Sequence, residues 1–362
     1  MDVKKEKVLI VGGGLVMGVI ASVLVFLGNP GNMGFCLACF IRDTTGALGL
    51  HRAEAVQYIR PELIGLILGS FLFAVGKKEF SARGGSAPLT RFALGFCVMV
   101  GALMFLRCPF RMILRIAGGD LNAVVGIVGF IAGIGAGTFF LKRGYSLKRT
   151  YRLPAAEGAI WPLVQLALLA LLIAAPAFIL FTAAGKGPGA QHAAIAVSLV
   201  AGLIVGALAQ QTRFCMVGGV RDFILFRENR LLLGFVSVLV AACIANLVLG
   251  AVAGKEFFKL GFEGQPVAHT DGLWNFLGLF LVGFASVLLG GCPLRQMILS
   301  GEGNGDSAIA ILGLTVGAAF CHNFGLAASG KGPTGAGEIA VIVCLAAAVA
   351  IACANTFGKS KA

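Results

Sequence analysis

Charge is scarce in this chain. Only 12% of its 362 residues are Asp, Glu, Lys or Arg, whereas hydrophobic residues make up 58%. An ordinary soluble domain carries about 25% charged residues, so this chain has too little charge to cover a water-facing surface. The shortage excludes the soluble globular, disordered and disulfide-stapled secreted classes. The sequence therefore predicts a polytopic membrane protein, surrounded by membrane lipid.

Acidic residues and histidines are few. Sixteen Asp and Glu oppose 29 Lys and Arg, which gives a formal net charge of +13. In a soluble protein this excess would indicate nucleic acid, but here we expect no nucleic-acid partner, because cationic loops anchor helix ends at the cytoplasmic face. The four histidines are scattered without metal-ligand spacing, so we expect no metal site and no cofactor.

Ten apolar stretches approach the length of about 20 residues that a membrane-spanning helix needs. They are 8–28, 60–76, 91–106, 120–141, 161–183, 191–209, 231–253, 273–291, 306–327 and 336–357. Four stretches between them are too short and too polar to cross, and we interpret them as re-entrant hairpins: 31–50, 107–119, 210–226 and 292–305. The predicted fold class is an all-α polytopic membrane protein.

The basic residues also predict an orientation. With re-entrant hairpins, the connecting segments fall alternately on two sides, and 19 of the 29 Lys and Arg lie on the side of the two termini. The positive-inside rule then places both termini in the cytoplasm. The predicted location is the bacterial inner membrane, with multiple passes.

The chain repeats itself. Phe35-Cys36 and Phe214-Cys215 are offset by 179 residues, and each is followed at the same spacing by an Arg-Asp pair. Cys108-Pro109 and Cys292-Pro293 are offset by 184 residues. One extra helix between the copies would invert the second, as in many transporters. The predicted divisions are a first repeat with a basic loop (1–160), a linking helix (161–190), a second repeat (191–335) and a closing helix (336–362).

Each predicted hairpin carries one corresponding cysteine. These are Cys36, Cys108, Cys215 and Cys292. The proline after two of them suits the first turn of a short helix, whose positive N-terminal end favours an anion. A thiol adds a weak donor and a polarisable sulfur. Four thiols on one path would therefore suit a sulfur- or selenium-bearing anion, although free cysteines are also common as small buried hydrophobes.

Other polar residues of the hairpins are secondary candidates. Cys39 forms a C-x-x-C motif with Cys36, which in isolation would indicate redox chemistry. Arg111 and Arg295 follow the Cys-Pro cysteines by three residues, where they would either attract an anion or anchor the hairpin. The remaining candidates are the Arg-Asp pairs, which are either intramembrane ion pairs or surface charges: Arg42, Asp43, Arg221 and Asp222.

At these motifs the chain resembles the YeeE/YedE sulfur-transport family, and most nearly its YedE-type branch, which is associated with selenium transport. The matching motifs are Gly34-Phe35-Cys36, Arg42-Asp43, Arg107-Cys108-Pro109, Arg213-Phe214-Cys215, Arg221-Asp222 and Gly291-Cys292-Pro293-Leu294-Arg295. The resemblance implies an inner-membrane protein with inverted repeats and short re-entrant helices. It also implies that thiosulfate passes along the four hairpin cysteines, beside a cytoplasmic sulfur carrier of the SirA/TusA type.

Three functions compete at this point. The favoured interpretation is a permease, not an enzyme, that imports a small sulfur- or selenium-containing anion. The alternative is a membrane thiol-disulfide oxidoreductase that uses Cys36 and Cys39. The third is a scaffold that recruits a sulfur carrier through the basic loop near Lys142 and Arg143.

Overall fold

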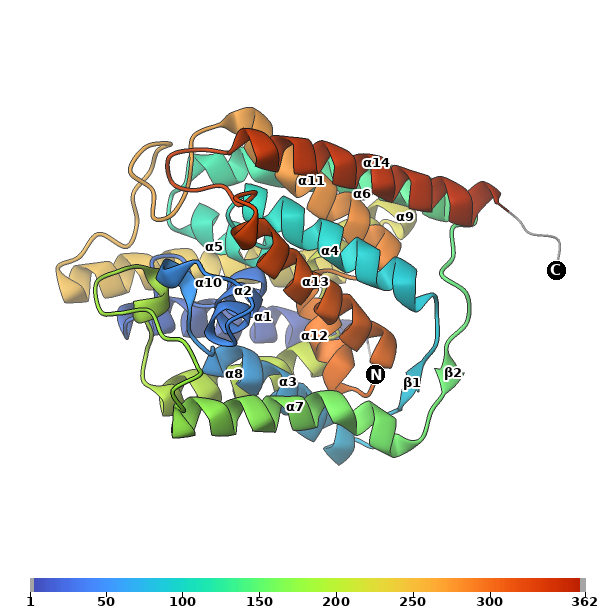
Figure 1. Ribbon diagram of the computed structural model, residues 1–362, viewed down its shortest axis with the longest axis horizontal. Coiled ribbons are helices and arrows are strands. Elements are labelled where there is room, and N and C mark those ends of the chain that lie inside the picture. Colours follow the sequence, from blue (N-terminus) through green and yellow to red (C-terminus); the bar gives the residue numbers. More distant parts are fainter. Residues whose placement is uncertain (1–2, 359–362) are drawn as a thin grey trace.

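The computed structural model describes residues 3–358 of the chain, and their regular secondary structure is almost entirely helical (Figure 1). The α-helices are α1 (Val3–Phe26), α2 (Leu37–Ala47), α3 (Pro61–Gly76), α4 (Pro88–Met104), α5 (Pro109–Ala117), α6 (Leu121–Lys142), α7 (Ala155–Ala174), α8 (Ile195–Thr212), α9 (Met216–Phe226), α10 (Arg230–Ala253), α11 (Gly272–Leu289), α12 (Pro293–Gly301), α13 (Gly305–Asn323) and α14 (Gly335–Phe357). The remaining elements are the 3₁₀ turns η1 (Glu54–Val56) and η2 (Pro188–Ala190) and a two-stranded antiparallel sheet of β1 (Arg83–Gly84) and β2 (Tyr151–Arg152).

The predicted fold class is confirmed. Within the described residues, ten helical stretches are long and apolar enough to cross a membrane, and the four short helices α2, α5, α9 and α12 fall inside the four predicted hairpins. The largest difference from the expected boundaries is at α7, which begins at Ala155 and ends at Ala174 rather than spanning 161–183. Ala175 ends it in the left-handed conformation, and Pro176 cannot continue a helix.

Four pairs of long helices form the body of the fold, and each pair joins one helix from each half. α1 packs against α10, α3 against α8, α6 against α11 and α4 against α13. Small residues line these contacts: a Cβ at Gly65 would overlap the α8 backbone at Leu199, and one at Gly69 would overlap it at Leu203. Membrane helices associate closely through such small residues, because lipid supplies no hydrophobic force between them. In each pair the contacts follow the same order along both helices, so the two helices run parallel to each other.

Equivalent helices of the two halves run in opposite directions. Gly13 of α1 lies beside Thr212 at the end of α8, whereas the backbone N–H of Ala193, just before α8, donates to Asn29, just after α1. The same holds for α4 and α11, because Arg91 at the start of α4 donates to the Leu289 carbonyl at the end of α11. These contacts favour the predicted inverted repeat, which stays a prediction.

The connecting segments gather at two opposite ends of the molecule (Figure 1). At one end, residues 254–271 contact 118–121, and residue 180 bonds to residue 47. At the other end, β1 pairs with β2 and residue 81 bonds to residue 302. The grouping agrees with connections that alternate between two membrane faces. Which face is cytoplasmic stays a prediction.

Candidate functional site

Each of the four hairpin cysteines is the N-cap residue of a short helix. Cys36 precedes α2, Cys108 precedes α5, Cys215 precedes α9 and Cys292 precedes α12. All four side chains are buried. The first backbone N–H groups of a helix have no partner within it, and the helix dipole adds partial positive charge there. The sequence thus places four sulfurs at four electropositive helix ends.

The first hairpin turns back into the protein immediately after α1. The chain leaves α1 at Phe26, and eight residues later Gly34 packs against the backbone of Ala21, which lies more than one turn inside that helix. A Cβ at Gly34 would overlap this backbone, so the sequence needs glycine here. The close approach places Cys36 and the N-terminus of α2 beside α1, further inside the protein than the end of that helix.

The hairpins of the first half bring three thiols together, and we call Cys36, Cys39 and Cys108 the first thiol cluster. The Sγ atoms of Cys36 and Cys39 are 2.8 Å apart, and the Cys108 thiol interacts with that of Cys36. The Cys108 sulfur also lies close to the backbone N–H groups of Ala38 on α2 and Arg111 on α5. Two helix N-termini therefore converge on one sulfur.

The second half repeats this arrangement with two thiols, and we call Cys215 and Cys292 the second thiol cluster. Their Sγ atoms are 3.9 Å apart. The Cys292 sulfur lies close to the backbone N–H groups of Met216 and Arg295, and the Cys215 sulfur accepts from the Gly218 N–H at 3.2 Å. The helices α9 and α12 thus converge on Cys292 as α2 and α5 converge on Cys108.

Three buried arginines belong to the α5 hairpin. Arg111 and Arg115 lie four residues apart on α5, a spacing that keeps helical side chains on one face, and Arg107 directly precedes the N-cap residue Cys108. Their side chains are at most 1% exposed. None of the three guanidinium nitrogens of Arg107 has a hydrogen-bond partner, and Arg107 lies within electrostatic reach of Cys36 and Cys39. An unpaired buried charge is among the costliest features in a protein.

The other two arginines of this hairpin have partners. Arg111 donates to the Gly31 carbonyl at 2.6 Å and contacts the Cys39 sulfur at 3.9 Å. Arg115 forms an ion pair with Asp120 at 2.6 Å, and its guanidinium lies 4.3 Å from the centre of the Phe105 ring. Only Arg115 therefore has a carboxylate partner.

The first Arg-Asp motif is part of a buried ion network. Asp43 accepts from Arg42 at 2.6 and 2.8 Å through one carboxylate oxygen and from Arg60 at 2.7 and 2.8 Å through the other. Arg60 also donates to the carbonyls of Pro188 and Gln191. The network fixes α2 against the start of α3 and the loop that contains η2, which is a structural role.

The corresponding residues of the second half are more exposed. Arg221 and Asp222 pair with each other at 2.8 Å, and their side chains are 29% and 24% exposed. Arg295 forms an ion pair with Glu302 at 3.1 Å. The two Arg-Asp motifs therefore share a sequence but differ in environment, because no second-half arginine takes the place of Arg60 beside Asp222.

Other polar groups lie apart from these clusters. Within residues 3–358, no group of three or more His, Cys, Asp or Glu side chains is arranged to hold a metal ion. His51 stacks near His322, with ring centroids 4.8 Å apart, and burial lowers the pKa of His51. Cys97 on α4 and Cys344 on α14 interact with each other.

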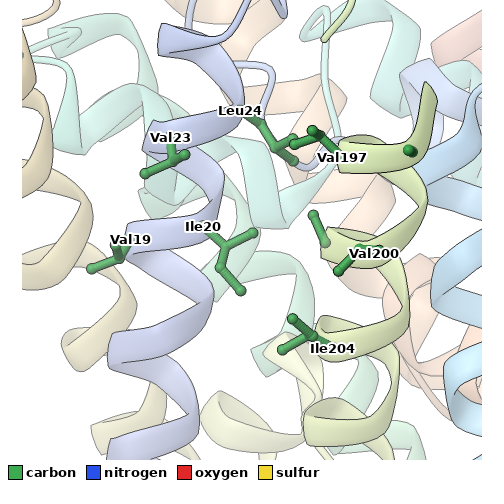
Figure 2. Close-up of a pocket in the computed structure, with 9 residues that line it drawn as sticks. Val19, Ile20, Val23, Leu24, Val197, Val200 and Ile204 are labelled. Carbon is green, nitrogen blue, oxygen red and sulfur yellow. The ribbon is translucent and has the colours of Figure 1, made fainter. Parts of the chain in front are cut away.

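An apolar groove between α1 and α8 suits lipid hydrocarbon rather than an anion. It has a volume of about 420 Å³ and only apolar lining residues, including Val23 and Val200 (Figure 2). Val200 is 52% exposed, so the groove opens to the outside of the helix bundle. An anion would find no hydrogen-bond donor there.

The structure is therefore that of a polytopic membrane protein with two buried thiol clusters. The sulphur transport family matches residues 211–354, which contain Cys215 and Cys292. The thiosulfate transporter TsuA of Escherichia coli (strain K12) is 28% identical to this chain over 113 residues. Both findings show that part of this chain is similar to the sulfur-transport family.

The extent of these matches is limited. The alignment with the Escherichia coli transporter covers 31% of this chain and 30% of the relative. The family match begins after both Cys36 and Cys108. The activity and substrate of this chain are therefore proposals, which are made below.

Arg107 and Arg115 are site residues that our sequence reasoning passed over. Arg115 follows Arg111 by four residues, which sets both on one face of the short helix, and Arg107 directly precedes Cys108; these positions were the signal that could have found them. Arg60, the second partner of Asp43, carried no such signal, because it lies 17 residues further along the chain.

Proposed function

We propose that this protein is an inner-membrane permease that imports a small sulfur-containing anion. One observation carries the proposal: in each half, two short helices meet with their N-terminal ends on a buried thiol pair. Backbone N–H groups and helix dipoles stabilise negative charge. The family match and the thiosulfate-transporting relative support the same class of substrate.

The thiols would act as neutral, exchangeable contacts for the substrate. A thiol is a weak donor and a polarisable acceptor, so it can hold a terminal sulfur or selenium atom without binding it tightly. Conduction requires binding sites that are strong enough to be entered and weak enough to be left. Two thiol clusters in succession, at Cys36–Cys108 and Cys215–Cys292, meet this requirement.

The proposed substrate class is a thiosulfate-like anion or a selenium analogue with the same geometry. Both have a polarisable chalcogen that suits a thiol, whereas sulfate presents only oxygen atoms. We therefore expect uptake of thiosulfate, competition by selenosulfate, which carries a terminal selenium atom, and weaker competition by sulfate.

The test is uptake of ³⁵S-labelled thiosulfate into proteoliposomes that contain the purified protein. Cys108→Ala and Cys292→Ala should each reduce initial uptake at least about tenfold, because each removes the sulfur on which two helix ends converge. Cys353→Ala is the matched control, since Cys353 lies on α14 outside both clusters, and its uptake should equal that of the wild type. Equal uptake by all three variants would refute the thiol path.

The competing oxidoreductase makes the opposite prediction. The Cys36 and Cys39 sulfurs are 2.8 Å apart, a contact that dithiol chemistry could use. The permease requires Cys292 and tolerates Cys39→Ser, whereas an enzyme that uses the C-x-x-C pair requires Cys39 and tolerates Cys292→Ala. Uptake and thiol oxidation measured on these two variants separate the functions.

A cytoplasmic sulfur carrier of the SirA/TusA type is proposed as a partner at the basic connection between α6 and α7. Arg143 is exposed there, and Lys142, Lys148 and Arg149 lie close to it in the sequence. Neutralising these four residues should weaken carrier binding in a pull-down without reducing uptake into proteoliposomes. Loss of both carrier binding and uptake would contradict a separate docking role. If carrier binding is lost while uptake still requires Cys108 and Cys292, the scaffold interpretation is excluded.

A further inference from the structure

The two thiol clusters differ in charge although they occupy equivalent positions. The offset of 184 residues that relates Cys108 to Cys292 also relates Arg107 to Gly291 and Arg111 to Arg295. Arg295 is neutralised by Glu302 at 3.1 Å. The first cluster therefore has two guanidinium groups without a carboxylate partner, and the second cluster has none.

Arg107 is the group that most needs a ligand. Its side chain is 1% exposed, and its Nε, Nη1 and Nη2 atoms all lack a hydrogen-bond partner. The ionisable groups that act on it are the guanidinium groups of Arg111 and Arg42, which repel it, and the thiols of Cys36 and Cys39. Buried charges in proteins are normally paired, and the described residues supply no carboxylate for this one.

Arg111 adds a second cation beside the same thiols. Its Nη1 atom lies 3.9 Å from the Cys39 sulfur, whereas its Nε atom has no partner. Guanidinium groups bind oxoanions through pairs of N–H donors. The unpaired Nε of Arg111 and the three free nitrogens of Arg107 are therefore donors for an oxoanion.

We propose that Arg107, Arg111 and the N-termini of α2 and α5 form an oxoanion-recognition site at the first thiol cluster, selective for a divalent anion. The inference rests on the proposed function and specifies the charge of the anion that the permease would select. Two unneutralised guanidinium groups match two negative charges, and the thiols of Cys36 and Cys108 contact the soft end of the anion.

The charge difference also assigns separate tasks to the two clusters. The first cluster captures the anion, because its cations favour negative charge. The second cluster passes it on, because it offers thiols and helix ends without a free cation and so holds the anion less tightly. Selectivity for charge therefore belongs to the first half alone.

Binding of anions to the purified full-length protein in detergent tests this proposal. Thiosulfate, sulfate and chloride are titrated at constant ionic strength, with the shift in melting temperature or the heat of binding as the readout. We expect binding of thiosulfate and sulfate, with thiosulfate tighter, and no saturable binding of chloride. Equal binding of chloride would overturn the selectivity for divalent anions.

The variants locate the site. Arg107→Gln should weaken thiosulfate binding at least about thirtyfold, as expected when one partner of a buried charge pair is removed, and Arg107→Lys should give an intermediate affinity. Arg152→Gln is the control, because it also removes one positive charge but is exposed on β2, outside the cluster. Affinities of Arg107→Gln and Arg107→Lys that equal the wild type would overturn the proposal, and Arg107→Lys decides the outcome if Arg107→Gln does not fold.

Cys292→Ala separates this inference from the proposed function. It should keep wild-type thiosulfate affinity, because it leaves the first cluster intact, while uptake into proteoliposomes falls. If the wild-type protein binds thiosulfate without transporting it, and Arg107→Gln loses that binding, the recognition site holds and the permease is wrong. If uptake depends on Cys292 but anion binding does not depend on Arg107, the permease holds and the recognition site is wrong.

Discussion

The replacement Asp43→Asn tests the buried ion network in depth. Asp43 is fully buried and is the only carboxylate that pairs with Arg42 and Arg60 among the described residues. Asparagine has nearly the same shape but no charge, and its amide nitrogen would face guanidinium donors. The change therefore leaves two buried cations without a counter-charge.

The expected loss of stability follows from this geometry. Breaking a buried ion pair from one side costs about 3–5 kcal/mol. Unfolding entropy is about 2 cal/mol/K per residue in soluble proteins, which for this chain length corresponds to a fall in melting temperature of about 4–7 °C. The shift is a lower bound, because helices that persist in detergent reduce the entropy of unfolding. Thermal unfolding of the purified protein measures it.

The internal repeat supplies the matched control. Asp222 occupies the equivalent position, but it pairs only with Arg221 and its side chain is 24% exposed. Solvent-exposed ion pairs contribute roughly 0–1 kcal/mol, so Asp222→Asn should lower the melting temperature by about 1 °C. Equal shifts for Asp43→Asn and Asp222→Asn would refute the argument that burial, rather than the motif, decides the role.

Two further predictions concern α5 and α6. Arg115→Met should lower the free energy of unfolding by about 3 kcal/mol, measured by thermal unfolding, because it leaves the buried carboxylate of Asp120 without its cation; an unchanged melting temperature would contradict it. Gly133→Val should reduce the yield of monodisperse protein in size-exclusion chromatography, because a Cβ there overlaps the backbone of α11 at Phe280, whereas Gly135→Val should have no effect, since its Cβ meets no atom within 4 Å. Similar yields for the two variants would contradict the proposed helix contact.

Much of the fold followed from the length of apolar runs, because a bilayer imposes one length on every spanning helix. The short helices followed from the repeated cysteines and from the proline after two of them. The boundary of α7 did not, since its first turn contains Ala155 and Glu157, which are not apolar enough to signal a span but still form a helix.

The site was only partly predictable, because chemistry that depends on partners distant in sequence leaves no local pattern. The cysteines could be placed at helix ends from their neighbours along the chain. The pairing of Asp43 with Arg60 and the absence of any partner for Arg107 depend on the packing of separate elements. Whether the two thiol clusters form one path stays a prediction.

The pairing of helices across the two halves has a consequence for biosynthesis. Ser22 of α1 bonds to the Ala242 carbonyl of α10, 220 residues later in the chain. At a synthesis rate of about 5–20 residues per second, α1 waits roughly 10–45 s in the bilayer before its main neighbour emerges. During that interval the arginines of α5 have no completed protein interior around them, so the nascent first half is the stage at which quality-control proteases or insertion factors would act on this protein.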